Sequence, residues 1–521
     1  MPGGRRSLQV RVDWRASASL VGTVLKFLAV PLAVPLLVAL GYGEDFLPFA
    51  AVLGLTVLLG LGLERLEPDP DIGAREGFLM VGLTWLAVTV VGMLPYVLAG
   101  LGTGSALANP VNALFETMSG FTTTGATVMG DISVDGHSHA IMLWRQLTQW
   151  LGGMGIVVLA VAILPELSVG GAQLMDAEAP GPGIEKLTPR IAETARVLWL
   201  IYFAFTVAEF VLLYGLHLGG LAPNMDLYNA VAHPLTTMPT GGFSPEARSI
   251  EAFSAAVQWV VIPFMVAAGT NFALFWRVRS GDIRAPVRDT EWRYYVGILG
   301  VVTAIGTGLL FAGPGIGLAE VPGIDAIGGQ IEDSLRHGAF QAVSIVTTTG
   351  YASMDFNTWG QTGQFLLVFA MFLGGSAGST GGAIKMVRTL VILKSLKREL
   401  FTTVHPDAVS PVRLGGRALD ERAVRGIYAF TLLYVVLFAV GTGLVMLDSL
   451  RLAEPLPILD AASAVAATLG NVGPGVGAVG PMENYQFFPA TTKLLMTFLM
   501  WVGRLEIIPV FVLLTAAYWR S

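Results

Sequence analysis

The 521-residue chain contains no cysteine, only six histidines, and few charged residues, which make up 13% of the total. The absence of cysteine excludes disulfides and thiolate metal sites, and it leaves the redox compartment undetermined. The charged fraction is about half of the roughly 25% found in an average soluble domain. Hydrophobic residues make up 54%, and the mean hydropathy is +0.66. These values predict a protein embedded in a membrane.

Apolar runs near 20 residues recur along the sequence and indicate membrane-spanning helices. We expect nine of them, at 20–41, 45–63, 77–100, 139–165, 193–218, 252–276, 294–313, 424–447 and 488–517. A tenth apolar run, at 361–394, is too long for one straight span and is interrupted by glycines. The first run is read as an uncleaved helix, because it is too long for a signal peptide and has no clear cleavage site. The predicted fold is an all-α polytopic membrane protein with about ten transmembrane helices.

The distribution of basic residues predicts the orientation of these helices. Arginine and lysine are concentrated in the linkers 277–293 and 385–425, and Arg5, Arg6 and Arg11 precede the first apolar run. By the positive-inside rule, both linkers and the N-terminus are expected in the cytoplasm. The opposite side is poor in basic residues and carries scattered carboxylates, which attract cations or are ordinary solvated loop residues.

Four short turns that carry Thr or Gly interrupt the apolar sequence at nearly even intervals. They are Thr122-Thr123-Thr124-Gly125, Pro239-Thr240-Gly241-Gly242, Thr347-Thr348-Thr349-Gly350 and Asn471-Val472-Gly473-Pro474. We align them on Gly125, Gly241, Gly350 and Gly473. Non-helical backbone at membrane depth is tolerated only where protein or a water-filled cavity satisfies its polar groups. Four such turns around one axis predict a ring of carbonyl oxygens of the kind that selects cations.

Each turn follows an apolar run that is too short to cross a bilayer and suits a re-entrant half-helix. These runs are Asn109–Ser119, Leu227–Met238, Glu332–Val346 and Ile458–Leu469, and His233-Pro234 is expected to kink the second. The sequence therefore predicts four units of helix, re-entrant pore loop and helix in a pseudo-fourfold arrangement. We divide the chain into an N-terminal hairpin and four pore repeats, at 1–71, 72–170, 171–280, 281–400 and 401–521.

Each half-helix is expected to point its C-terminus, with its partial negative charge, at the ion path. Glycine permits the positive φ that turns successive carbonyls the same way. The residues expected to form this ion-binding filter are Thr123, Thr124, Gly125, Pro239, Thr240, Gly241, Thr348, Thr349, Gly350, Asn471, Val472 and Gly473. Because the fourth turn has no Thr, selectivity is expected to rest mainly on backbone carbonyls.

The apolar run 361–394 contains a second candidate site, a loop just inward of the third turn. Its residues Gly374, Gly375, Ser376, Ala377, Gly378, Ser379, Thr380, Gly381 and Gly382 include five glycines, which disfavour a continuous helix. The loop is expected either to gate the ion path or to pack helices closely. Arg504, in an apolar run, is expected to face the pore and repel cations, or to form a buried ion pair. Arg145 is expected to serve in packing.

Other functional classes find less support. The sequence does not indicate an intramembrane enzyme. It contains no HExxH motif, no paired membrane aspartates and no Ser/His pair in the apolar helices. His233 and His337 lie in different units and are interpreted as polar residues near the water-filled entrance of the pathway. An inverted-repeat transporter is disfavoured because all four turns lie on the same side of the membrane.

Several of these motifs together resemble the Trk/Ktr/HKT superfamily of potassium transporters, specifically its TrkH-type membrane subunit. The resemblance rests on FETMSGFTTTGAT at 115–127, EKLTPRIAETARVLW at 185–199, TTTGY at 347–351, GGSAGSTGGAIK at 374–385 and GRLE at 503–506. It also includes WRQLTQWLGGMGIVVLAVAILP at 144–165, TGGFS at 240–244 and NVGPG at 471–475. The matches extend through nearly the whole chain.

The resemblance implies potassium uptake across the bacterial inner membrane, with the turns as the filter, Gly374–Gly382 as the gate loop and Arg504 as the pore arginine. It further implies a homodimer and a cytosolic TrkA-type regulatory subunit that carries the nucleotide. No covalent cofactor and no nucleic acid are expected, and potassium is the substrate. A less selective sodium/potassium pathway and a cation-coupled symporter remain alternatives. The chain departs from the family pattern at Ala383, where a stiffer loop is expected, and at Met238-Pro239.

Overall fold

Helices make up most of the computed structural model, which describes residues 12–69, 73–162, 191–313 and 327–520. Arg5, Arg6 and Arg11, and the start of the motif at 185–199, lie outside the described residues. The helices of the first half are α1 (Trp14–Tyr42), α2 (Leu47–Glu64), α3 (Ala74–Gly92), α4 (Leu94–Gly100), α5 (Pro110–Phe121), α6 (Val134–His137), α7 (His139–Ala162), α9 (Ile191–Leu218), α10 (Leu227–Ala232), α11 (Pro234–Thr237), α12 (Ala255–Ala268) and α13 (Phe272–Arg279).

The second half continues this helical pattern and adds one short hairpin. Its elements are α14 (Ala285–Arg288), α15 (Thr290–Ala312), α16 (Ile331–Val346), α17 (Gly360–Ala370), α18 (Met386–Val404), β1 (Arg413–Leu414), β2 (Arg417–Ala418), α19 (Glu421–Ser449), α20 (Ile458–Leu469), α21 (Ala490–Arg504), α22 (Ile508–Leu513) and α23 (Ala516–Arg520). The antiparallel strands β1 and β2 have two residues each, so the regular structure of the described residues is all-α apart from this hairpin.

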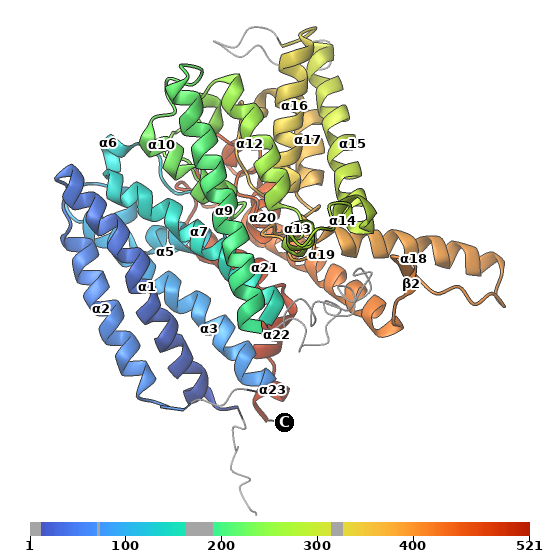
Figure 1. The fold of residues 1–521 in the computed structure, drawn as a ribbon, viewed down its shortest axis with the longest axis horizontal. Helices are drawn as coiled ribbons and strands as arrows, with labels where there is room; N and C mark the ends of the chain where they lie inside the picture. Colours follow the sequence, from blue (N-terminus) through green and yellow to red (C-terminus); the bar gives the residue numbers. More distant parts are fainter. Residues whose placement is uncertain (1–11, 70–72, 163–190, 314–326, 521) are drawn as a thin grey trace, which may run out of the picture.

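The N-terminal hairpin of α1 and α2 lies on one side of the helical body (Figure 1). The two helices approach closely where glycines face each other. A Cβ atom on Gly22 would lie 2.7 Å from the carbonyl oxygen of Gly60, and the reverse distance is the same. Small residues allow such backbone contact between membrane helices. Many large apolar side chains of α1 and α2 remain exposed, as expected for a surface that faces lipid.

Among the described residues, six helices are long and apolar enough to cross a membrane, or seven if α12 and α13 form one bent span. This number is lower than the ten spans expected, because several predicted spans are interrupted. The run 252–276 bends by 94° between α12 and α13. The run 488–517 is broken after α21, where Glu506 and Ile507 both have positive φ. Helix α7 has sufficient length but carries polar residues along its first half.

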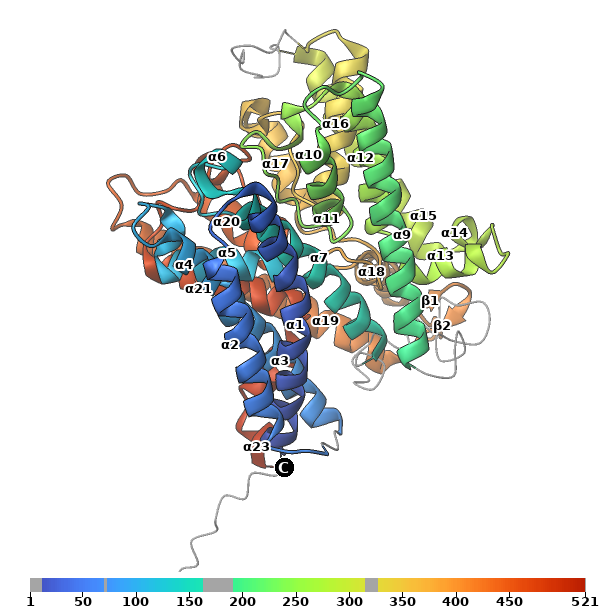
Figure 2. The same cartoon turned by 60° about the vertical axis from the view of Figure 1, so that its left-hand side comes forward.

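The interrupted run 361–394 has the predicted form of helix, loop and helix. Helix α17 ends at Ala370, and α18 begins at Met386. Between them, the backbone of Leu373 and Ile384 forms an isolated bridge that closes the loop. Helix α18 then extends sideways from the body (Figure 1), and the β1–β2 hairpin lies beside its middle, where Lys394 Nζ donates to the Arg413 carbonyl. Figure 2 shows the same helices from another side.

The four short helices that precede the turns are α5, the pair α10 and α11, α16 and α20. The predicted kink in the second is present, because α10 ends at Ala232 and α11 begins at Pro234. Each of these helices ends in the middle of the protein, where its C-terminal residues are buried. They bring the four turns into one region of the core.

Candidate ion pathway

The four turns adopt the same backbone conformation. In each, two residues with positive φ are separated by one residue: Thr123 and Gly125, Thr240 and Gly242, Thr348 and Gly350, and Asn471 and Gly473. In each, the intervening residue donates its N–H to a carbonyl of the preceding helix. These bonds run from Thr124 to Ser119, Gly241 to Thr236, Thr349 to Ser344 and Val472 to Ala467, at 2.8–2.9 Å. The repeated geometry relates the four turns residue by residue.

This geometry corrects the alignment of the second turn. Gly242, with a φ of 75°, corresponds to Gly125, Gly350 and Gly473, whereas Gly241 has no positive φ and corresponds to Thr124. Pro239 therefore falls one residue before the set that matches the other three turns. The sequence alignment on Gly241 was wrong by one position, because the two adjacent glycines gave no signal of which one is left-handed.

The turns contact one another in cyclic order. A Cβ atom on Gly125 would lie 2.2 Å from the carbonyl oxygen of Gly241, one on Gly242 would lie 1.9 Å from that of Thr349, and one on Gly350 would lie 2.0 Å from that of Val472. The contact that closes the ring joins Gly473 to the carbonyl oxygen of Thr124, at 2.6 Å. Glycine is therefore required at each position for two reasons: the residue has a positive φ, and the neighbouring carbonyl leaves no space for a Cβ atom. The first turn meets the second, the second the third, the third the fourth, and the fourth the first.

The side chains at the first left-handed position of each turn are Thr123, Thr240, Thr348 and Asn471. All four are buried, and neither Thr123 Oγ1 nor Asn471 Oδ1 has a hydrogen-bond partner. Buried oxygens without partners are costly unless water or an ion satisfies them. Asn471 therefore has a buried side-chain oxygen without a partner in the fourth turn, where the sequence has no Thr hydroxyl. Its Nδ2 donates to Thr124 Oγ1 at 3.0 Å and to the Met500 carbonyl at 2.9 Å.

An open pocket lies directly outside the turns. It is lined by the four equivalent glycines Gly125, Gly242, Gly350 and Gly473, and the carboxylates Glu246 and Glu483 lie on its wall. Within the described part of the chain, no group of three His, Asp or Glu side chains is arranged to hold a metal ion. An ion at the turns would be bound mainly by neutral carbonyl, hydroxyl and amide oxygens.

A buried ion pair supports the first two turns from behind. Arg145 Nε donates to Glu116 Oε1 at 2.7 Å, and both side chains are almost fully buried. Glu116 also accepts hydrogen bonds from Thr127 Oγ1 and the Val128 amide, each at 2.9 Å. Arg145 Nη1 donates to the Ser244 carbonyl at 2.9 Å. The sequence reading identified Arg145 as a packing residue, but its role is to join the exit segments of two turns.

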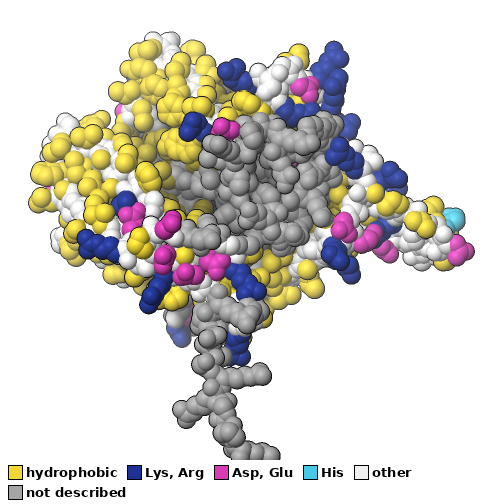
Figure 3. Space-filling model, turned by 60° about the horizontal axis from the view of Figure 1, so that its bottom comes forward, with side chains coloured by type: hydrophobic (Ala, Val, Ile, Leu, Met, Phe, Trp, Pro, Cys, Tyr) yellow, Lys and Arg dark blue, Asp and Glu magenta, His cyan; other side chains and the backbone are white. Residues whose placement is uncertain are grey.

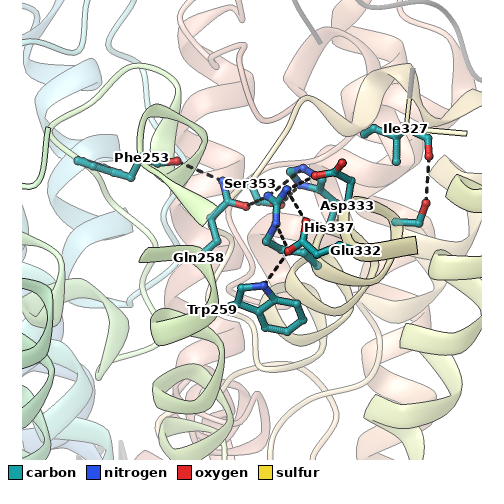
Figure 4. A network of polar contacts seen from close by, with 10 residues as sticks. Phe253, Gln258, Trp259, Ile327, Glu332, Asp333, His337 and Ser353 are labelled. Carbon is teal, nitrogen blue, oxygen red and sulfur yellow. Dashed lines mark hydrogen bonds and ion pairs between the residues drawn. The ribbon is translucent and has the colours of Figure 1, made fainter. Parts of the chain in front are cut away.

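A second polar network supports the third turn, shown in Figure 4. Arg336 of α16 is paired with Glu332 and Asp333 and donates to Gln258 of α12. The neighbouring His337 makes a 2.8 Å hydrogen bond between Nδ1 and Ser353 Oγ, in the segment that leaves the turn. His337 thus links the short helix to its exit segment.

The glycine-rich loop lies against the turns and is bonded to a residue of the third turn and to the residues just before the second and fourth. The Gly382 N–H donates to Thr348 Oγ1 at 2.7 Å, and the Ala383 N–H donates to the Gly470 carbonyl at 2.9 Å. The Thr380 hydroxyl donates to the Met238 carbonyl at 3.0 Å. These acceptors stand where the third, fourth and second turns begin, so the loop covers the side of the ring on which the short helices end.

Arg504 joins this loop to the first unit. Its Nη1 donates to the Thr380 carbonyl at 2.7 Å, and its Nη2 lies 3.4 Å from the Gly152 carbonyl of α7. Among the described residues, no carboxylate lies within salt-bridge distance of Arg504, because Glu506 is paired with Arg388. The alternative of a buried ion pair for Arg504 therefore finds no support. Its charge is held by backbone carbonyls beneath the turns.

Comparison with known proteins identifies the family. The family model described as a cation transport protein, TrkH, matches residues 52–287 and 326–521. The Trk system potassium uptake protein TrkH of Halomonas elongata is 36% identical over 96% of this chain and 98% of its own length. The chain belongs to the TrkH family of cation transport proteins. It is a member of a family of transporters and not of enzymes.

Two further relatives of the TrkH family agree along the full length. The TrkH protein of Escherichia coli strain K12 is 36% identical over 98% of this chain and 100% of its own length. The crystal structure of the potassium transporter TrkH from Vibrio parahaemolyticus superimposes with a TM-score of 0.83, at 33% identity, over 98% of this chain. The agreement in fold supports a mostly helical, multi-pass membrane protein.

Proposed function

We propose that this protein carries potassium ions across a cell membrane through the ring of four turns. The relatives named above are potassium uptake proteins. The single observation that carries the proposal is the cyclic contact of the four left-handed turns, each with one glycine against its neighbour's carbonyl oxygen. Closely spaced carbonyl oxygens replace the hydration shell of a cation.

The selectivity filter, in this proposal, consists of residues 123–125, 240–242, 348–350 and 471–473. This set keeps eleven of the residues expected from the sequence and replaces Pro239 with Gly242. The short helices α5, α10–α11, α16 and α20 place their C-terminal ends behind it, where their partial negative charge stabilises a cation. The four units form a pseudo-fourfold arrangement around the ion path, with the N-terminal hairpin outside it.

The loop Gly374–Gly382, together with Arg504, is the proposed gate. It lies against the inner side of the ring, and the guanidinium of Arg504 places a fixed positive charge there. A cation that leaves the filter inward meets both the loop and this charge. Conduction requires the loop to move away from Thr348 and Gly470.

The proposal includes the expected assembly and orientation. The linkers rich in Arg and Lys, and the end of α18 with the β1–β2 hairpin, face the cytoplasm. Figure 3 shows that Lys and Arg side chains lie around the lower face of the molecule, along with several carboxylates. This face suits a cytosolic nucleotide-binding regulatory subunit of the TrkA type. A homodimer in the bacterial inner membrane is part of the same proposal.

Complementation of a bacterial strain that lacks its own potassium uptake systems tests the function. Expression of the wild-type chain is expected to restore growth at low potassium. The Gly350→Ser variant introduces a side chain whose Cβ would lie 2.0 Å from the Val472 carbonyl oxygen, so it should restore growth less well at matched expression. Growth that depends on added sodium would favour the less selective pathway or a coupled symporter. Failure of the wild-type chain, with its regulatory partner co-expressed, would contradict the proposal.

A further inference from the structure

The carboxylate of Glu291 binds both the glycine-rich loop and the first turn of α18. Glu291 lies in the first turn of α15 and is almost fully buried. Its Oε1 accepts a hydrogen bond from the Ala377 N–H at 2.7 Å and another from the Val387 N–H at 3.0 Å. Ala377 lies in the first half of the loop, and Val387 lies in the first turn of α18. One oxygen atom therefore joins two points of the chain that flank the inner part of the loop.

The first turn of α18 has further ionic attachments beside this carboxylate. Arg388 is paired with Glu506 in the break after α21, and its guanidinium lies 3.9 Å from the ring centre of Phe430. Lys385 is buried, and its ammonium donates to the Gly381 carbonyl. The start of α18 is thus held by two carboxylates from different parts of the chain.

We propose that Glu291 is a positioning residue for the gate, whose carboxylate keeps the loop Gly374–Gly382 against the inner side of the filter. This inference rests on the proposed function of the loop. Because the same oxygen binds Ala377 and Val387, a displacement of the first turn of α18 breaks one bond and weakens the other. Hydrogen bonds to a charged acceptor are roughly twice as strong as those between neutral groups. Breaking the hydrogen bonds from Ala377 and Val387 to the Glu291 carboxylate is therefore a main step in the opening of the loop.

Displacement of α18 would break the hydrogen bond between Val387 and Glu291. Helix α18 projects from the helical body (Figure 1), and after its far end the chain returns to the β1–β2 hairpin beside the middle of the helix, where Lys394 Nζ donates to the Arg413 carbonyl at 2.9 Å. A partner that binds this exposed end and displaces α18 acts directly on the Val387–Glu291 bond. At the other end of the loop, the Ser376 N–H donates to the Gly269 carbonyl at 2.9 Å. That bond does not involve α18, so the loop is expected to open from its α18 side.

The absence of cysteine allows a direct test of loop position. A single thiol introduced by Ser379→Cys, at a buried residue within the loop, reports opening by its rate of reaction with a water-soluble thiol reagent. Glu291→Ala, Glu291→Gln and Glu291→Asp are placed in this background. The purified full-length proteins are reconstituted in liposomes without a regulatory partner, and rubidium flux is measured in parallel. Glu64→Ala, which removes a carboxylate paired with Lys26 in the N-terminal hairpin, is the matched control.

Glu291→Ala is expected to raise both flux and thiol modification at least fivefold. Glu291→Gln retains an oxygen that accepts both bonds but loses the charge that strengthens them, so an increase smaller than that of Glu291→Ala is expected. Glu291→Asp keeps the charge but shortens the side chain, so an intermediate increase is expected, and it decides the result if Glu291→Ala does not fold. The Glu64→Ala control is expected to match the parent.

Two results would overturn the inference, and they differ in what else they reject. Unchanged flux and unchanged modification in Glu291→Ala and Glu291→Asp would show that the carboxylate does not hold the loop, and the gate would stand. Faster modification without faster flux would show that Glu291 holds the loop but that the loop is not the gate. That second result would reject the proposed gate along with this inference.

Discussion

Substitution of Gly242 by alanine tests the register of the four turns. Gly242 has a φ of 75°, a conformation that costs an L-residue roughly 1–2 kcal/mol. The new Cβ would lie 1.9 Å from the Thr349 carbonyl oxygen, whereas real Cβ contacts are not closer than 3.0 Å. The carbonyl, or the turn that bears the new methyl group, must therefore move by about 1 Å.

A movement of this size changes the spacing of the oxygens around the ion. If about 1–2 kcal/mol of the preference for potassium depends on that spacing, selectivity over sodium falls by roughly 5- to 30-fold. The assay is the ratio of potassium to sodium permeability, obtained from reversal potentials of reconstituted protein. Thermal unfolding of the same samples shows whether the variant is folded.

Gly241→Ala is the matched comparison at the neighbouring residue. Gly241 has no positive φ, and its new Cβ would meet the Gln149 side chain at 2.4 Å rather than a backbone carbonyl. Because a side chain can rotate away, we expect a smaller loss of selectivity than in Gly242→Ala. A large loss in Gly241→Ala with an unchanged ratio in Gly242→Ala would refute the register derived from the backbone.

Three further substitutions test the gate and the support behind the turns. Ala383 has a φ of 51°, so Ala383→Gly should relieve about 1 kcal/mol of strain in this conformation of the loop. If this conformation is the closed one, ion flux measured without a regulatory partner should fall about fivefold. A higher flux would contradict the assignment of this conformation as closed. Arg504→Ala removes the positive charge bonded to Thr380 and should raise leak several-fold; a folded variant with wild-type leak would show that the charge is no barrier. Glu116→Gln leaves Arg145 buried without its carboxylate and should lower the free energy of unfolding by about 3–5 kcal/mol; an unchanged unfolding temperature would contradict the role of this pair.

The sequence predicts elements well where a local signal marks them. The short apolar run before each turn was sufficient to predict the half-helices, including the break at His233-Pro234. The density of glycine predicted the interruption of 361–394. These signals depend on chain length and on residue type, which are readable without knowledge of any contact.

Features that depend on tertiary contacts were not predictable. The break at Glu506 and Ile507 has no glycine at its left-handed positions. The ion pair between Glu506 and Arg388, which is distant in the sequence, stabilises it. The role of the Asn471 side chain depends on its hydrogen bonds to Thr124 Oγ1 and the Met500 carbonyl, which belong to other parts of the chain. The chain positions of Glu116 and Glu291 gave no sign of their partners, because these partners come from other elements.

The most direct test of the central claim measures which ion crosses the membrane and what drives it. The purified protein is reconstituted in liposomes, and potassium, rubidium and sodium fluxes are compared under an imposed membrane potential and an imposed pH gradient. The ring of four turns predicts that potassium and rubidium move much faster than sodium, and that an imposed potential drives them without a pH gradient. Equal potassium and sodium fluxes, or potassium movement only in the presence of a pH or sodium gradient, would contradict a selective, channel-like filter.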